Sequence, residues 1–320
     1  MTTLENNSKT TNRKSAVIYK IRSQLPLFMM SLPGAIITFM FSYVPIFGII
    51  LAFKKINLRQ GIFGSPWYGL KNFSYLFKTN DAFIIIRNTI GYNLSFMITG
   101  LILGVALAIA LSMMRNKRGS KIFQTVFIMP HFLSMVIVSY LVLAFLNMEN
   151  GFVNTLLSGI FGIKPINWYV EPKYWPYILV IVNLWKEMAF GSIIYISTIA
   201  GIDTQLYEAA AIDGATTWQQ VKCITLPMLK TIICINIILS LGYILGGDFG
   251  LFYQVPMNSG PLSDVTTTIP VYVYRNLSAG GPRALGLASA TSFIQSVVGC
   301  ILVVTANKVV SKIDSESSLF

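Results

Sequence analysis

Few residues of this sequence have the type and spacing that chemistry requires. Its 320 residues include one histidine, His131, and three cysteines that lack metal-ligand or disulfide spacing. No GxxxxGK[ST] segment, which would bind nucleotide phosphates, is present. The 12 acidic residues form no carboxylate pair or Ser-His-Asp set suited to catalysis. The sequence therefore predicts a protein that is not an enzyme and holds no metal or cofactor of its own.

Two adjacent charges, Lys186 and Glu187, stand inside a long apolar run. Charge is costly in such a run and is usually functional, so we expect one of them to face a translocation path or a gate. Adjacent residues on a helix point about 100° apart, which predicts that they do not pair with each other. A structural role also stays open, with Asn183 as the partner of Glu187 or with a charge on another chain. Asp248, near the end of a later apolar run, is as consistent with a solvated helix end as with a binding group.

The least expected segment of the chain, Tyr207–Pro227, reads YEAAAIDGATTWQQVKCITLP. It lies between apolar runs, yet its first part is built from helix formers. Gly214 interrupts it where a helix would end, and Thr216 can cap a second short helix. Pro227 suits the first turn of the next apolar helix. The sequence thus predicts two short helices across a membrane face, and a stiff helix pair can transmit a push.

This segment resembles the EAA signature of the permease subunits of ABC-type importers. The signature residues keep the spacing of that family and are Glu208, Ala209, Ala210, Gly214, Ile224, Leu226 and Pro227. In the family this loop docks in a groove of a separate ATPase chain. The resemblance therefore implies that Glu208, Ala209, Ala210 and Gly214 make the ATPase contact.

The resemblance extends over about residues 27–312 and is greatest to permeases for polysaccharide and oligosaccharide uptake. Trp67–Phe73, Trp185–Glu187 and Tyr272–Arg275 fit that branch. It implies an all-α integral membrane fold of six helices, the type I importer permease, that translocates carbohydrate by alternating access. It also implies the partners: a second homologous permease in a heterodimer, two ATP-binding subunits that bind ATP and Mg²⁺, and an extracytoplasmic solute-binding protein.

Sugar sites combine aromatic faces with hydrogen-bonding side chains, because a sugar has an apolar face and a rim of hydroxyls. Residues of both kinds lie in the apolar runs, although each could serve only for packing or for helix–helix hydrogen bonds. The candidates for the substrate path are Asn183, Trp185, Lys186, Glu187, Tyr195, Tyr243, Asp248 and Gln295.

Composition predicts a protein that crosses the membrane several times. The chain is 54% hydrophobic and only 11% charged, against about 25% charged residues in a soluble domain. We expect a basic arm (1–24), a transmembrane domain (25–312) with a coupling loop (203–227), and a tail (313–320). We expect Pro33 and Pro45 to kink the first span. The six expected spans are Leu25–Phe53, Asn88–Met114, Ile122–Leu146, Tyr174–Ile202, Pro227–Gly247 and Ala284–Asn307.

The distribution of basic residues predicts the orientation in a bacterial cytoplasmic membrane. The cluster at residues 115–121 and the basic arm place both termini in the cytoplasm. The net charge of +12 therefore reflects membrane orientation and not nucleic-acid binding. One segment disagrees, since residues 54–81, expected outside, also contain five basic residues.

Two readings from other classes of function remain as alternatives, and one alternative lies within the importer class. A proton-coupled secondary transporter would use a buried carboxylate such as Glu187, but it leaves the spacing of the signature unexplained. An importer permease could carry a solute that is not a sugar, such as an amino acid or phosphate. A membrane-embedded enzyme would need an acidic or metal-binding cluster, which the sequence does not display.

Overall fold

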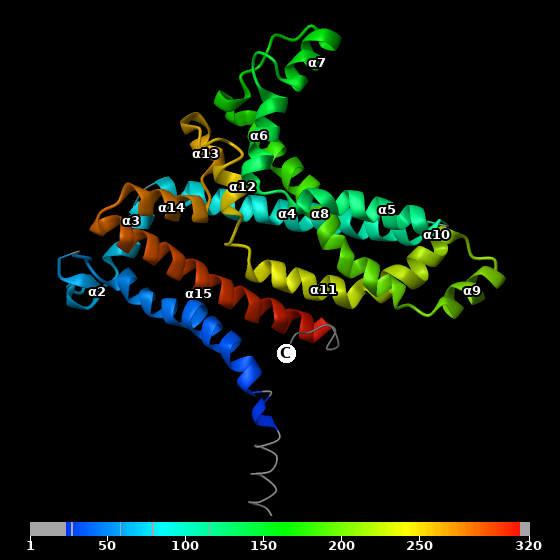
Figure 1. Ribbon diagram of the computed structural model, residues 1–320, viewed down its shortest axis with the longest axis horizontal. Coiled ribbons are helices and arrows are strands. Elements are labelled where there is room, and N and C mark those ends of the chain that lie inside the picture. Colours follow the sequence, from blue (N-terminus) through cyan, green and yellow to red (C-terminus); the bar gives the residue numbers. More distant parts are fainter. Residues whose placement is uncertain (1–23, 27, 58, 79, 115, 314–320) are drawn as a thin grey trace, which may run out of the picture.

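The computed structural model describes residues 24–26, 28–57, 59–78, 80–114 and 116–313. The predicted basic arm up to residue 23, the tail from residue 314 and Arg115 lie outside the described residues. The described part is built of helices, and its one β-bridge joins Lys54 to Trp67. Figure 1 shows long helices lying side by side, with shorter ones at both ends of the bundle.

Five of the described helices are long and apolar enough to cross a membrane, and a sixth span is formed if one sharply bent pair is counted as a unit. This agrees with the predicted six-helix fold, although the boundaries of the helices differ. The elements are Gln24–Phe53, α4 (Asn80–Ser112), the bent pair of α5 (Lys117–Ile128) and α6 (Met135–Leu146), α8 (Trp175–Ala200), Thr217–Gly242 and α15 (Pro282–Ile313).

The centre of the bundle is the pair α4 and α8, which pack along their lengths. At one end, Tyr92 of α4 and Trp175 and Leu179 of α8 are buried with residues of the shorter helices. Toward the other end, Val105 and Tyr195 form a second buried cluster with α11 (Leu226–Gly242). These two helices therefore position whatever side chains the middle of α8 carries.

The third span, expected from Ile122 to Leu146 with a kink at Pro130 and His131, is broken at these residues. After α5, residues Met129–Phe132 form the 3-10 helix η3 with Pro130 in its first turn. The chain then turns by 98° before α6 begins at Met135. Proline lacks an amide hydrogen and clashes with the preceding turn. The sequence therefore signals the break but not its angle.

The first span changes its helix type at Pro45, as expected of a proline-induced distortion. Residues Phe39–Tyr43 form the π-helix η1 and Val44–Phe53 the 3-10 helix η2. Around Pro33, by contrast, the helix stays α-helical. The second part of this span, η2, packs against α15 and α3, while the first part diverges from the bundle (blue in Figure 1), and only 6% of the most apolar window of the span is buried. Most of its apolar surface therefore has no partner among the described residues of this chain.

The fifth span begins ten residues earlier than the predicted start at Pro227. The α-helix α10 (Thr217–Gln220), the π-helix η6 (Val221–Thr225) and α11 form one continuous helix. A π-turn just before Pro227 widens the helix where the proline ring removes a hydrogen bond. The helix ends at Gly242, five residues before the predicted end.

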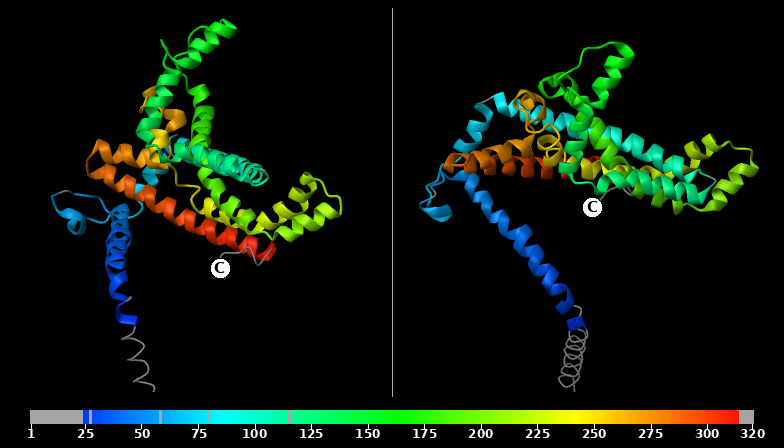
Figure 2. Two further views of the ribbon diagram at one scale, coloured as in Figure 1. Left: turned by 45° about the vertical axis from the view of Figure 1, so that its right-hand side comes forward. Right: turned by 45° about the horizontal axis from the view of Figure 1, so that its top comes forward.

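The segments expected as loops contain short helices. Residues 54–81 hold α2 (Gly61–Gly64) and α3 (Lys71–Lys78), and residues 147–173 hold α7 (Phe152–Phe161) and the 3-10 helices η4 (Trp168–Val170) and η5 (Pro172–Tyr174). Residues 248–279, which we call the cap segment, contain α12 (Phe249–Tyr253), η7 (Gly260–Leu262), α13 (Ser263–Thr266) and α14 (Ile269–Ala279). In both views of Figure 2, α3 and α14 lie at one end of the bundle and α9 (Thr204–Ile212) at the other.

The close approach of α11 and α15 gives a prediction about packing. A Cβ atom at Gly299 would lie 2.9 Å from the carbonyl oxygen of Gly242. We expect Gly299→Ala to destabilise the purified protein by about 1–3 kcal/mol, because backbone must move to admit the methyl group. Gly91→Ala, where nothing lies within 4 Å, is the control. Equal thermal stability of the two variants in detergent would contradict this packing.

Candidate functional site

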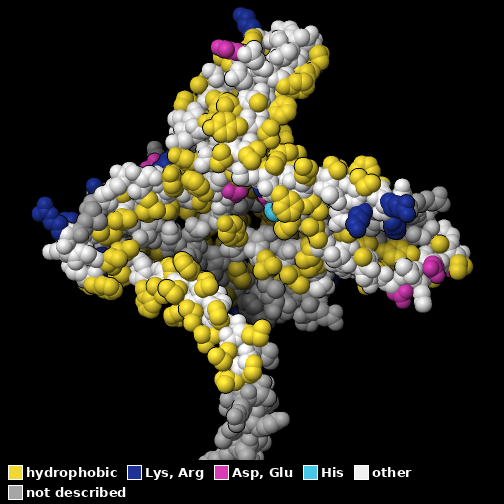
Figure 3. All heavy atoms as spheres, in the orientation of Figure 1, with side chains coloured by type: hydrophobic (Ala, Val, Ile, Leu, Met, Phe, Trp, Pro, Cys, Tyr) yellow, Lys and Arg dark blue, Asp and Glu magenta, His cyan; other side chains and the backbone are white. Residues whose placement is uncertain are grey.

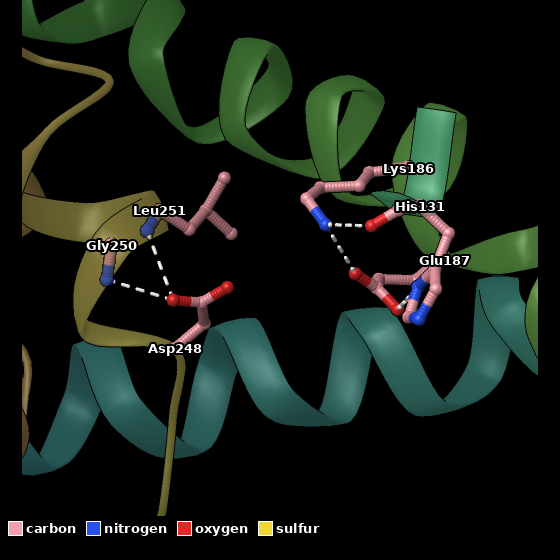
Figure 4. Close-up of polar contacts among 6 residues, drawn as sticks. All are labelled: His131, Lys186, Glu187, Asp248, Gly250 and Leu251. Carbon is pink, nitrogen blue, oxygen red and sulfur yellow. Dashed lines mark hydrogen bonds and ion pairs between the residues drawn. The ribbon is translucent and has the colours of Figure 1, made fainter. Parts of the chain in front are cut away.

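The charged residues in the middle of α8 meet the broken span (Figure 4). The Lys186 ammonium is buried and donates to the carbonyl oxygen of His131 at 2.8 Å. It also lies 3.3 Å from Glu187 Oε1. The expectation that Lys186 and Glu187 do not pair is therefore wrong. Their side chains start in different directions, and both bend toward His131 and meet there.

His131 is held on two sides of its ring. Its Nδ1 lies 2.9 Å from Glu187 Oε2. The ring stacks on Phe190 of the next turn of α8, with centroids 3.9 Å apart and planes 2° apart. Glu187 therefore takes His131 as its partner and not Asn183, the alternative that its sequence spacing had left open.

These contacts explain how a helix can break inside an apolar bundle. A helix end leaves carbonyl and amide groups without intrahelical partners, and an apolar surrounding offers no water to replace them. Lys186 supplies a donor to the carbonyl side of the break. On the other side, the Ser134 hydroxyl caps α6 by accepting from the amide of Ile137 at 3.3 Å. The bend is thus built into the sequence on both sides.

Next to this cluster lies a cavity of about 670 Å³, which we call the path cavity. It is lined by α4, α8 and α11, and it contains Asn183, Glu187, Tyr195 and Asn236. The Asn236 amide donates to the Tyr195 hydroxyl at 3.1 Å. Amide, carboxylate and phenol groups on otherwise apolar walls match the hydroxyls and apolar faces of a sugar.

The other predicted path residues lie elsewhere. Asp248 caps α12 through its Oδ1, which accepts from the amides of Gly250 at 2.7 Å and Leu251 at 3.3 Å. Figure 4 shows its second oxygen turned toward the side on which Lys186 and Glu187 lie. Two more residues, Tyr243 and Gln295, line a smaller cavity of about 200 Å³. The remaining candidate, Trp185, is 45% exposed and is not part of the path-cavity wall.

The second predicted site is the helix pair of residues 203–227, which we call the coupling segment. Its first helix, α9, is capped by Asp203, whose side chain accepts from the Gln205 amide at 2.9 Å. It ends at Gly214, where φ is +78°, a conformation that favours glycine. The Ala215 amide donates to the Ala210 carbonyl at 2.9 Å and closes a Schellman-type turn.

The second helix of the pair starts as the sequence predicted. The Thr216 hydroxyl accepts from the Gln219 amide, and the Gln219 side chain accepts from the Thr216 amide, forming a capping box. This helix continues without interruption into α11. A displacement of the coupling segment therefore acts directly on a membrane-spanning helix.

The coupling segment presents an exposed face that the sequence analysis identified only in part. Glu208 and Ala209 are exposed, as a docking surface requires. The most exposed large apolar residues of this segment are Ile212 at 87% and Trp218 at 70%. Large apolar groups in a polar turn were the sequence signal that could have added Ile212 and Trp218 to this exposed face.

Polar bonds that the sequence did not predict attach the cap segment to α4. Asn88 donates to the carbonyls of Asp264 and Thr267, at 2.9 and 3.0 Å. Within the cap, Arg275 donates to Thr267 and Asn258, and burial lowers the pKa of its guanidinium. Nearby, burial raises the pKa of Tyr169 to about 12. This phenol therefore remains a neutral hydrogen-bond donor at physiological pH.

The comparisons with known proteins agree with this geometry. The family described as "Binding-protein-dependent transport system inner membrane component" matches residues 100–252. The polygalacturonan/rhamnogalacturonan transport system permease protein YteP of Bacillus subtilis is 33% identical over 308 residues, 95% of this chain and 93% of the relative.

Two solved structures also match the fold. One is a bacterial ABC transporter involved in the import of the acidic polysaccharide alginate, with a TM-score of 0.83 and 31% identity over 93% of this chain and 99% of the other. The second is a bacterial alginate ABC transporter in complex with a periplasmic protein bound to alginate pentasaccharide. It has a TM-score of 0.82 and 30% identity over 92% of this chain and 97% of the other.

The broken span gives a prediction about Lys186. We expect Lys186→Met to destabilise the bend by about 1–3 kcal/mol, because the carbonyl of His131 loses its donor. Spin labels at Phe123 on α5 and Tyr140 on α6 would report a broader distance distribution in the variant. Lys164→Met, at an exposed lysine, serves as the control. An unchanged distribution in the Lys186 variant would show that the ammonium does not hold the bend.

Proposed function

The chain belongs to the family of binding-protein-dependent transport system inner membrane components, and from that membership we propose that it is the transmembrane subunit of an ATP-driven importer of oligosaccharide. The observation that carries the proposal is a capped, exposed helix pair that is continuous with a span. It occurs in a chain that is 33% identical, over 95% of its length, to a polygalacturonan/rhamnogalacturonan transport system permease. Membrane insertion follows from the apolar helices.

The orientation of the chain is part of this proposal. The coupling segment and the basic residues that begin α5 lie at one end of the bundle and face the cytoplasm, with both termini on that side. The basic residues in the segment 54–81, which this orientation places outside the cell, disagree with the prediction. Lys54, however, is buried and donates to the carbonyls of Ile62 at 3.0 Å and Phe63 at 2.8 Å. The Lys54 ammonium is therefore hydrogen-bonded within the fold, and its charge does not indicate on which side of the membrane this segment lies.

The importer requires further chains. A solved relative was captured with a saccharide-bound periplasmic protein, and a protein of that kind would deliver solute to the end of the bundle opposite the coupling segment. A second, homologous permease completes the pathway. The first span and α6 present apolar side chains that no described part of this chain covers, such as Phe41 and Tyr140. ATP and Mg²⁺ belong to two separate ATP-binding subunits.

The coupling segment is the contact with those subunits. Glu208, Ala209, Ala210 and Gly214 form the turn that enters an ATPase groove, where small side chains permit close approach. Closure of the ATPase pair on ATP displaces this turn. The displacement passes into α11 through the continuous helix, and the rearranged bundle opens the path cavity to one side of the membrane and then the other.

The path cavity is the candidate route for the solute. Glu187, Asn183 and Asn236 offer acceptors and donors for sugar hydroxyls, and the aromatic wall suits the apolar face of a pyranose ring. Tyr243, Asp248 and Gln295 lie nearer the cap segment and are candidates for contact with the solute as it enters. A proton-coupled carrier based on Glu187 is not favoured, because it gives the coupling segment no role.

Purification of the complex tests the function. We expect this chain, extracted from its native membrane, to bring with it a second permease and an ATP-binding subunit. ATP hydrolysis by that complex should rise when its solute-binding protein is loaded with an oligosaccharide. Stimulation by an amino acid or phosphate instead would contradict the substrate class, and transport abolished by an uncoupler without any ATPase partner would contradict the mechanism.

The coupling segment gives a prediction about Glu208. We expect Glu208→Lys to leave the protein inserted and folded while saccharide-stimulated ATP hydrolysis falls by about tenfold or more, because a charge is reversed in the docking surface. Glu149→Lys reverses an exposed charge in the turn between α6 and α7, away from this segment, and is the control. Unchanged stimulated hydrolysis in the Glu208 variant would show that this turn does not transmit the signal.

A further inference from the structure

A second large cavity, of about 620 Å³, lies between the coupling segment and the bundle. We call it the coupling cavity. One wall comes from the end of α4 and the start of α5, including Ser112 and Lys117. The opposite wall comes from the coupling segment itself, including Tyr207, Thr217 and Gln220. The turn that contacts the ATPase is therefore not packed solidly against the helices that it must move.

The charge of this cavity is positive. Among the described residues that line it, Lys117 alone carries a charge at neutral pH. Its ammonium makes one long hydrogen bond, 3.4 Å to the Ser112 carbonyl, and the side chain is exposed. An ammonium has three N–H donors, so this lysine keeps donors for a ligand.

Uncharged donors surround the same space. The hydroxyls of Thr204 and Thr217 make no side-chain hydrogen bond within the described structure, although both line the cavity. The Gln220 amide makes only a long bond of 3.5 Å to the Tyr207 carbonyl. One cation with several hydroxyl and amide donors is the set that recognises a phosphate oxygen.

The inner wall of the cavity is apolar. Ile196, Ile199 and Ile202 of α8 and the turn after it line it. Side chains of lysine and arginine gather outside, near the start of α5, as the dark blue groups in Figure 3 show. An apolar wall beside a cationic rim suits an amphiphile with an anionic headgroup at a membrane surface.

We propose that the coupling cavity binds a phosphate-bearing anion through Lys117, supplied by the headgroup of an anionic phospholipid or by a soluble phosphorylated compound. The proposal rests on the proposed function, which places this end of the bundle in the cytoplasm. The bonds that attach α9 to the span are few: the Tyr207 and Thr225 hydroxyls at 2.9 Å, and the long bond from Gln220. A bound anion adds contacts between both walls and stiffens the attachment.

The test uses the complete transporter complex in nanodiscs. Nanodiscs of phosphatidylcholine alone are compared with nanodiscs containing phosphatidylglycerol, and with phosphatidylcholine nanodiscs to which glycerol 3-phosphate is added. Bound lipid or glycerol 3-phosphate is measured by native mass spectrometry, and saccharide-stimulated ATP hydrolysis by phosphate release. Lys117→Gln is the test variant. Arg118→Gln, the same loss of charge at the next residue but outside the cavity wall, is the matched control.

We expect Lys117→Gln to retain phosphatidylglycerol about five- to tenfold less than the parent and the Arg118 control, the change expected for one charge-assisted contact. Phosphatidylglycerol should raise stimulated hydrolysis in the parent and the control but not in Lys117→Gln. Retention of glycerol 3-phosphate in place of the lipid would support the soluble source.

Two results would overturn the inference: equal retention by all three proteins, or an equal loss in both variants, which indicates only general surface charge. Lys117-dependent retention without saccharide-stimulated hydrolysis in any lipid would contradict the proposed function and leave the site in place.

Discussion

The structure depends on the rule that a backbone group in an apolar bundle needs a partner from the protein itself. A helix that breaks by 98° inside the bundle leaves such groups without intrahelical partners, and the buried Lys186 ammonium supplies one of the missing partners. Lys186 donates to the carbonyl of His131, and Glu187 balances its charge while bonding the ring of the same residue. Burying a charge is expensive unless the charge is paired and hydrogen-bonded, and the Lys186 ammonium meets both conditions. The cluster thus stabilises a broken helix inside the bundle.

A second constraint concerns the transmission of force across the chain. A turn can move a membrane helix only if it is stiff and joined to that helix without a flexible link. Gly214 fixes the angle of the turn by a backbone conformation that other residues rarely adopt. The capping box at Thr216 starts the second helix, which runs as a single helix to Gly242. A π-turn accommodates Pro227 within it, so the proline distorts the helix without separating the coupling segment from the span.

Features governed by local chemistry could be predicted from the sequence, and features governed by distant contacts could not. The helix pair, its turn at Gly214 and its cap at Thr216 depend on neighbouring residues, and the structure contains all three. The partner of Glu187 lies 56 residues away in the chain, so helical spacing, which offered Asn183 as one possible partner, could not identify it. Pro130 indicated a distortion, but its angle depends on packing against α8. The short helices of the cap segment were missed because their apolar faces are buried only in the folded bundle.

The path cavity and the coupling cavity meet on one helix, which links the two sites physically. Ser197 of α8 lines the first and Ile196 the second. From Glu187 to the end of α8 at Ala200 the distance is about 20 Å at 1.5 Å per residue. A regular helix of this length moves as one body, so a force on its end near the coupling segment also shifts Lys186. Its acceptor, the carbonyl of His131, belongs to a different span and need not follow. The contacts of Lys186, Glu187 and Phe190 with His131 all cross from α8 to the broken span, so a relative movement of α8 acts on each of them.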